Sequence, residues 1–145
     1  MEVLEGIYGR RAIRDYLAEP VSRTTMRELI EAAVQAPSAM NERPWRFTVV
    51  TDKNLLSSIS IRAKTFALQG ADSRLRQMLA DPNFDIFYNA PALIVISAAR
   101  NSRWAVEDCT LAAENLMIAA HATSGANDHG IGNLTASLNS PRDAS

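Results

Sequence analysis

The run Ala92-Leu93-Ile94-Val95-Ile96-Ser97 decides the fold class of this 145-residue chain. Four consecutive large aliphatic residues with no polar residue between them are typical of a strand that is covered on both faces. Residues 105–120 follow and are apolar nearly all round, which predicts a long helix buried in its own core or in that of a partner. A buried strand beside such a helix predicts a layered α+β architecture.

The sequence before this run predicts further elements of both kinds. Apolar residues recur at helical spacing between positions 25 and 35 and predict a helix, with Thr25 and Glu28 as its capping box. Residues 46–51 are rich in β-forming side chains and predict a short strand. Residues 53–69 predict a second helix. Helices and strands therefore intermix along the chain.

Composition narrows the classes of function. Basic and acidic side chains number 15 and 16, and the net charge is −1, so we expect no nucleic-acid partner and no attraction to an anionic membrane. No apolar run reaches the length of a transmembrane helix, and the N-terminus does not resemble a signal peptide. The single cysteine, Cys109, excludes an intrachain disulfide and a Cys-rich metal site, and it indicates a reducing, cytoplasmic compartment.

The first candidate binding segment is Arg10-Arg11-Ala12-Ile13-Arg14. A guanidinium group can bond two phosphate oxygens at once, and each charge-assisted bond contributes roughly 1.5–3 kcal/mol. Two or three such groups are enough to hold a phosphate dianion. The alternative is a solvated face whose arginines pair with Glu5, Asp15 and Glu19.

The second candidate is the loop Pro37-Ser38-Ala39-Met40-Asn41-Glu42-Arg43-Pro44-Trp45. It joins a predicted helix to a predicted strand, where small polar groups can face a ligand. Ser38 and Asn41 can bond the edge of a heteroaromatic ring or a polyol chain. Their alternative role is to form turns. Trp45 is interpreted as a core anchor more than as a stacking platform.

Two further segments carry distinctive residues. The aromatic residues of segment 84–91 either line a substrate or pack against the sheet edge, and the second reading is preferred. In the predicted helix 105–120, Asp108 and Asn115 share a face, and each needs a partner if it is buried. Cys109 is interpreted as a small buried apolar residue. No metal-ligand spacing and no acid–base constellation is present, so a cofactor is expected to carry any chemistry.

Taken in order, four of these segments resemble the flavin-dependent nitroreductase family. Residues 10–14 are similar to its Arg-Arg-Ser-Ile/Val-Arg motif, and residues 37–45 to its Pro-Ser-x-x-Asn-x-Gln-Pro-Trp loop. Phe87-Tyr88-Asn89-Ala90-Pro91 and the strand after it resemble the family's aromatic-Ala-Pro-strand unit. Residues 108–117 resemble its central helix, Asp-x-x-x-Ala-x-x-Asn-Leu. The resemblance extends from residue 1 to about residue 122.

The resemblance implies an α/β sandwich with an antiparallel-rich sheet flanked by helices, in an intertwined homodimer that holds FMN between its subunits. It implies an FMN-dependent NAD(P)H oxidoreductase that works by ping-pong hydride transfer to a nitroaromatic, a quinone or a similar small acceptor. No side chain is expected to act as a catalytic group. The residues implied to bind the cofactor are Arg10, Arg11, Ala12 and Arg14 at the phosphate and ribityl end, and Pro37, Ser38, Ala39 and Asn41 of the other subunit along the ring.

The chain departs from the family pattern in three places. Ala12 stands where the family has serine, and Arg43 stands where it has glutamine. Residues 123–145 lack the family's next strand, flavin-contacting loop and basic C-terminal arm. We therefore expect a nitroreductase-like domain over residues 1–122, followed by an atypical polar or truncated tail over residues 123–145. The alternatives to turnover are a flavin-binding protein without activity and a truncated inactive relative.

Overall fold

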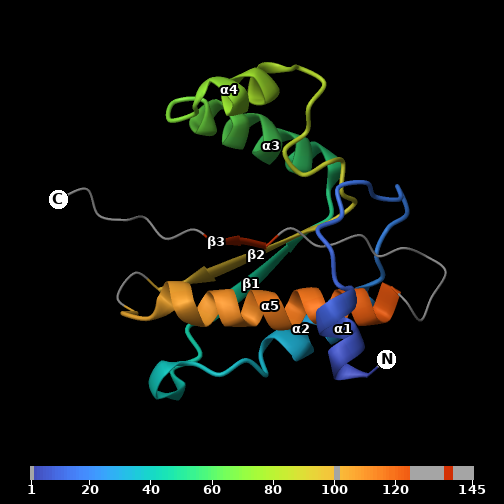
Figure 1. Cartoon of the computed structure of the whole chain (residues 1–145), viewed down its shortest axis with the longest axis vertical. Helices are drawn as coiled ribbons and strands as arrows, with labels where there is room; N and C mark the ends of the chain where they lie inside the picture. Colours follow the sequence, from blue (N-terminus) through green and yellow to red (C-terminus); the bar gives the residue numbers. More distant parts are fainter. Residues whose placement is uncertain (1, 100–101, 125–135, 139–145) are drawn as a thin grey trace.

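A three-stranded sheet lies at the centre of the computed structural model, which describes residues 2–99, 102–124 and 136–138 (Figure 1). The strands β1 (Trp45–Val50), β2 (Leu93–Ala98) and β3 (Ala136–Leu138) follow one another in that order across the sheet. β1 pairs antiparallel with β2, Trp45 opposite Ala98 and Val50 opposite Leu93, and β2 pairs parallel with β3. Within the described residues the sheet is therefore mixed, with one antiparallel and one parallel strand pair, and its middle strand is the predicted apolar run.

Strand β2 is covered on both faces, as its sequence predicts. Ile94 and Ile96 are fully buried in the larger core, which also contains residues of α2 and α5. Leu93 points to the opposite face, where it joins Val50 and Phe87 in a second, smaller core. Because side chains alternate along a strand, a run without polar residues supplies both cores at once.

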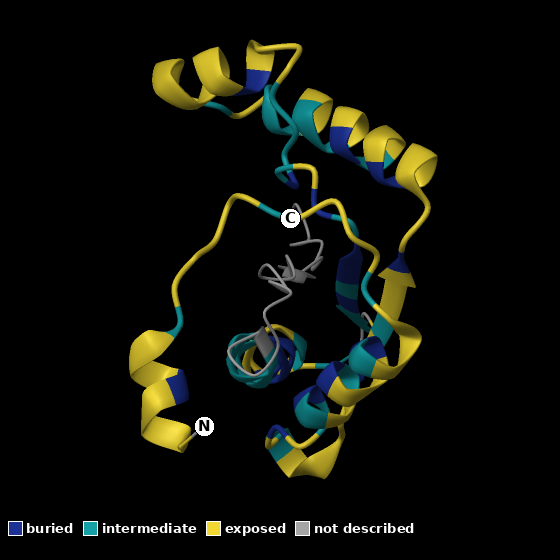
Figure 2. Ribbon diagram, turned by 90° about the vertical axis from the view of Figure 1, so that its right-hand side faces the viewer, coloured by how far each residue is buried: buried dark blue, intermediate teal, exposed yellow. Residues whose placement is uncertain are grey.

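Helices cover one face of the sheet. Helix α5 (Ala105–Ser124) packs against the sheet and against α2 (Arg23–Ala33), and α1 (Val3–Gly9) lies on its other side, as Figure 2 shows with α5 seen almost end-on. Ala112 and Leu116 are fully buried on the inner face of α5. Val106 and Leu111 are each 45% exposed. The apolar helix therefore buries one face within this chain and leaves apolar side chains outside.

Helices α3 (Lys53–Ala67) and α4 (Ser73–Ala80) form a separate layer at the far end of the sheet (Figure 1). Leu56 of α3 is buried in the second core. Lys64 of α3 links this helix to the segment that follows α4, because its Nζ donates hydrogen bonds to the backbone carbonyls of Asp81 and Phe84. None of the helices within the described residues has the length and apolar character needed to cross a membrane.

Four details differ from the sequence predictions. Helix α2 begins at Arg23 with Ser22 as its N-cap, whose Oγ accepts a hydrogen bond from Thr25 N, so the predicted capping box was wrong. Helix α1 was not predicted. Its cap is a reciprocal pair of Glu2 and Glu5. Helix α5 continues to Ser124, into the segment interpreted as a tail, and residues 136–138 form a strand. The rest of the predicted tail lies outside the described residues.

Candidate flavin site

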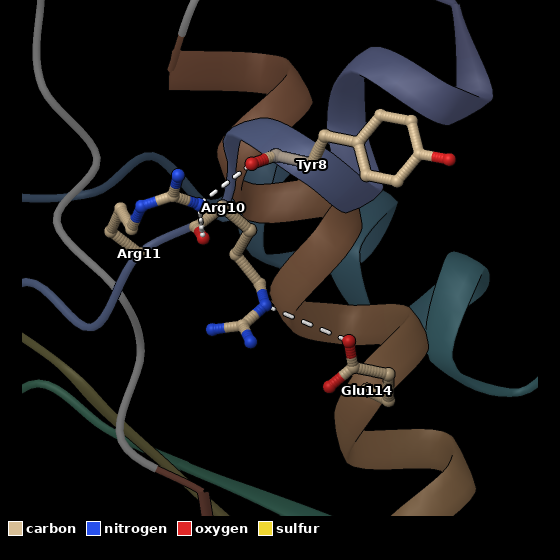
Figure 3. A network of polar contacts seen from close by, with 4 residues as sticks. All are labelled: Tyr8, Arg10, Arg11 and Glu114. Carbon is tan, nitrogen blue, oxygen red and sulfur yellow. Dashed lines mark hydrogen bonds and ion pairs between the residues drawn. The ribbon is translucent and has the colours of Figure 1, made fainter.

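The arginine segment, residues 10–14, leaves the end of α1 beside helix α5. Gly9 makes this approach possible, since a Cβ there would lie 2.6 Å from Nε2 of His121. Arg10 Nε then lies 3.6 Å from Oε1 of Glu114 on α5 (Figure 3). The two side chains are 29% and 47% exposed, so water weakens this ion pair and leaves the Arg10 guanidinium accessible.

Arg11 folds back on the helix that precedes it. Its Nη1 donates hydrogen bonds to the carbonyl oxygens of Tyr8, at 2.6 Å, and of Arg10, at 2.8 Å (Figure 3). The last carbonyl groups of a helix lack partners within the helix, and a cation beside them is favourable. Arg11 therefore closes the end of α1, while its side chain remains exposed to solvent.

Arg14 is held by an aromatic ring. Its guanidinium carbon lies 5.9 Å from the centre of the Tyr88 ring, which in turn meets the Phe84 ring edge-on at 5.6 Å. In the part of the chain that the structure describes, Arg14 has no carboxylate within ion-pair distance. The segment 84–91 therefore does more than pack the sheet edge: Phe87 is buried in the second core, as preferred, but Tyr88 faces the arginine segment.

Residues 37–45, called the η1 loop from here on, form a tight turn around the short helix η1 (Ala39–Asn41). Met40, Asn41 and Arg43 have φ angles of 51°, 56° and 48°, in the left-handed region that non-glycine residues seldom adopt. Two hydrogen bonds between residues of the loop stabilise the turn. Ser38 Oγ accepts a hydrogen bond from Arg43 N, and Asn41 Oδ1 accepts one from Arg43 Nε, both at 2.9 Å.

Ser38 and Asn41 thus play the turn-forming role that the sequence left open, and Asn41 is exposed to solvent. Arg43 stands where the resembled motif has glutamine, and its side chain supplies one of the two bonds that close the turn. Trp45 ends the η1 loop and is 8% exposed in the larger core, which confirms it as a core anchor.

The first turn of α5 reaches the η1 loop through Asp108. This residue is 3% exposed, and its Oδ1 accepts a hydrogen bond from Ala39 N at 2.9 Å. Its Oδ2 is buried without a hydrogen-bond partner among the described residues. Asn115 also has the partner that its burial requires, since its Nδ2 donates to Ala32 O at 3.4 Å. Cys109 is buried as expected. Burial, and secondarily the charge of Asp108, raises the pKa of its thiol above the ordinary value of 9.0.

The two halves of the predicted site contact α5 at different places. The η1 loop meets it at Asp108, and the arginine segment meets it at Glu114. Six residues of α-helix correspond to about 9 Å along the axis and about 1.7 turns around it. The η1 loop therefore contacts the first turn of α5, and the arginine segment contacts the middle of this helix on a different side.

Residues 7–124 match the sequence profile described as the Nitroreductase family. The chain belongs to the nitroreductase family. A relative in Archaeoglobus fulgidus that carries the provisional name NADH dehydrogenase/NAD(P)H nitroreductase is 38% identical over 125 residues, 82% of this chain and 61% of that protein. A similarly named protein of Methanothermobacter thermautotrophicus is 30% identical over 83% of this chain and 56% of its own length. The chain thus spans about 60% of the length of these nitroreductase relatives.

Solved structures agree with the family assignment and the α+β fold. A nitroreductase of Bacteroides fragilis with bound FMN superimposes with a TM-score of 0.78 at 31% identity, covering 86% of this chain and 66% of that one. An FMN-dependent nitroreductase of Clostridium difficile has a TM-score of 0.74 at 31% identity, covering 85% of this chain and 57% of that one. The sequence interpretation of the family and of the fold class is confirmed.

The residues present fit the chemistry of FMN at its anionic end. Arg14 has no acidic partner within the described ranges, and Arg10 has only the exposed Glu114. Guanidinium groups without a strong internal partner are suited to accept a phosphate. Ala12 offers no hydroxyl, so in this segment only the arginine side chains could bond a phosphate.

Two contacts of the site were missed from the sequence. Tyr88 and Glu114 were not considered as partners of the arginines, yet each faces one of them. The tyrosine had a weak local signal, because Asn89 after it is a residue type that favours the left-handed turn seen at Tyr88 and Asn89. Glu114 had no local signal, since it lies about a hundred positions from Arg10 along the chain.

Proposed function

We propose that this chain works as an FMN-dependent NAD(P)H oxidoreductase with ping-pong hydride transfer to a small acceptor such as a nitroaromatic or a quinone. The observation that carries the proposal is the arginine segment of a nitroreductase-family chain, where Arg14 has no acidic partner among the described residues and Arg10 has only a solvent-exposed one. The relatives named as nitroreductases and the FMN-bound neighbours support the same chemistry.

The proposed roles divide between two segments. Arg10, Arg11, Ala12 and Arg14 would hold the phosphate and the ribityl end, through guanidinium groups and backbone. Pro37, Ser38, Ala39 and Asn41 of a second copy would lie along the ring, where small side chains allow close approach. FMN, when bound, supplies the redox chemistry between nicotinamide and acceptor. This chain's residues bind and orient the flavin, and none of them needs to act as nucleophile.

A homodimer is part of the proposal. The η1 loop and the arginine segment contact α5 at different turns and on different sides, and in the proposed dimer each site combines the arginine segment of one copy with the η1 loop of the other. Apolar side chains are exposed on helices α1 and α5: Leu4 and Ile7 on α1, Val106 and Leu111 on α5. Exposed apolar side chains on two helices that pack against each other are a common feature of protein interfaces. They support an intertwined dimer built around α1 and α5.

The reductant and the compartment complete the proposal. The names of the relatives support NADH or NADPH as the reductant. The single cysteine is buried and unpaired, which suits a reducing cytoplasm.

The test is direct. The full chain is purified, FMN is added, and the bound flavin is measured by its visible spectrum and fluorescence. Oxidation of NADH and of NADPH is then followed with a nitroaromatic and with a quinone. We expect a yellow protein that consumes nicotinamide in an acceptor-dependent manner. A protein that FMN cannot reconstitute contradicts the proposal, and flavin binding without turnover supports the binding-protein alternative.

A further inference from the structure

The η1 loop has an unfavourable backbone conformation that contacts with the rest of the molecule must stabilise. Met40, Asn41 and Arg43 all occupy the left-handed region, which costs free energy for residues with a side chain. The bonds from Ser38 and Asn41 to Arg43 close the turn, but they lie within it. They shape the loop without fixing where it lies relative to the sheet and helices.

Among the described residues, two side-chain hydrogen bonds tie the middle of the loop to the rest of the molecule. Ser102 Oγ lies 3.3 Å from Oε2 of the exposed Glu42, where water competes. Asp108 Oδ1 accepts from Ala39 N at 2.9 Å, and Asp108 is 3% exposed. A short bond from an amide to a carboxylate is stronger than one to a neutral acceptor, and burial protects it from water. The Asp108 bond is therefore the main tie.

The surroundings of Asp108 make its position rigid. It lies in the first turn of α5, where a negative charge is favoured by the helix dipole. The next residue, Cys109, is buried, and Ala112 one turn further along is fully buried. The other oxygen, Oδ2, is buried without a hydrogen-bond partner in the described ranges, so the carboxylate makes a single described bond, to the loop.

We propose that Asp108 is a positioning residue for the flavin ring: its carboxylate fixes the backbone of Ala39, and with it the ring-facing part of the η1 loop, before any flavin binds. The proposal rests on the proposed function for its consequence, since the loop would face the flavin of a second copy. Its structural part, the dependence of the loop on Asp108, stands without flavin.

The first measurement needs no cofactor. Hydrogen exchange of the Ala39 amide is compared in the full-length wild type and in Asp108→Ala, with the core amides of Ile94 and Leu116 as the internal reference. We expect Ala39 to lose its protection in Asp108→Ala while the core amides keep theirs. Asp108→Asn retains an accepting oxygen, and we expect it to retain the protection.

The matched control is Asn115→Ala. Asn115 lies on the same helix, two turns on, and also bonds a backbone group, but that group is Ala32 O of α2. This variant removes another side-chain-to-backbone hydrogen bond of α5, a weaker one that joins it to α2, without touching the η1 loop. We expect unchanged exchange at Ala39.

The second measurement is FMN affinity of the same variants, followed by flavin fluorescence. Losing a bond to a charged group predicts FMN binding roughly ten- to hundredfold weaker in Asp108→Ala. Asp108→Asn and Asn115→Ala should stay near the wild-type value. Riboflavin should weaken in parallel with FMN, because the loop would face the ring and not the phosphate.

The outcomes separate the two proposals. Ala39 protection that survives Asp108→Ala, or that is lost equally in Asp108→Asn, overturns the role of Asp108 whatever the flavin result. If Asp108→Ala does not fold, the comparison of Asp108→Asn with Asn115→Ala decides. Loss of protection at the Ala39 amide in Asp108→Asn then overturns the proposal. A wild type that binds no FMN, with exchange as expected, overturns the proposed function and leaves the tie between Asp108 and the loop intact.

Discussion

The arginine segment and the η1 loop are held in place by different forces. The η1 loop is anchored in the interior, by Trp45 in the core and by the buried carboxylate of Asp108. The arginine segment lies at the surface, where a partly exposed ion pair and a ring contact hold Arg10 and Arg14. Buried contacts fix geometry before a ligand arrives, whereas exposed charges remain available to it. In the proposed site, the η1 loop would therefore be fixed before the flavin binds, while the guanidinium groups of Arg10 and Arg14 would remain free to adjust to it.

The largest expected effect is on stability and concerns the η1 loop, which is anchored in the core. Trp45→Ala removes a large buried ring, and we expect the free energy of unfolding to fall by about 3–5 kcal/mol. Chemical denaturation followed by circular dichroism measures it. The control is Trp104→Ala, because Trp104 is 44% exposed and its ring faces the guanidinium of the neighbouring Arg103. The control should cost less than about 1 kcal/mol. Equal losses would show that the η1 loop is not anchored through Trp45.

The next effect concerns the arginine segment, and it changes FMN binding but not stability. Arg14→Gln removes a guanidinium without an acidic partner in the described residues, so FMN should bind roughly ten- to hundredfold more weakly while stability is unchanged. Riboflavin, which lacks the phosphate, should bind as it does to the wild type. Arg27→Gln on the exposed face of α2 is the control. An equal loss for both flavins would place Arg14 away from the phosphate.

A smaller effect is expected at the ion pair between Arg10 and Glu114. Glu114→Gln should lower the free energy of unfolding by at most about 1 kcal/mol, because both side chains are partly exposed. The difference should shrink as salt is raised, since screening weakens an exposed pair. Glu31→Gln on α2 serves as the control. A loss above this range that salt does not reduce would mean that the arginine segment is held as rigidly as the η1 loop.

The smallest effect concerns Cys109, next to Asp108. Burial raises the pKa of this thiol, so the folded chain keeps a proton that the unfolded chain releases above pH 9.0. The stability that this provides is fully present below that pH and is lost as the pH rises through the folded-state pKa. The stability difference between the wild type and Cys109→Ala should therefore decline above pH 9.0. A difference independent of pH would contradict the burial of the thiol.

The fold could be predicted where local patterns carried the signal. Ile94 and Ile96 stand in a run whose composition alone implies burial on both faces, and that run is β2. Helix α1 was missed because it is short and its cap residue, Glu2, is not of the usual N-capping type. The start of α2 was misplaced because Ser22 and Thr25 are both capping residues three positions apart, and propensity does not choose between them.

The candidate site residues could be proposed from residue type, but their contacts could not. Arg14 and Ser38 were found as candidates from their chemistry. The tie from Asp108 to Ala39 spans 69 positions, and no local pattern reveals such a pair. The left-handed conformation of Met40 was also unpredictable, because methionine has no preference for it and only the surrounding bonds impose it.

The central claim is that one flavin site is assembled from the arginine segment of one copy and the η1 loop of another. The measurement is FMN binding by a mixture of two defective variants, Arg10→Gln/Arg14→Gln and Ser38→Ala/Asn41→Ala, refolded together. In a two-fold dimer, about half of the randomly formed pairs are mixed, and each mixed pair holds one intact site, so about a quarter of the sites should regain FMN. A mixture that binds no more FMN than the separate variants, beside a wild type that binds it fully, would contradict the claim.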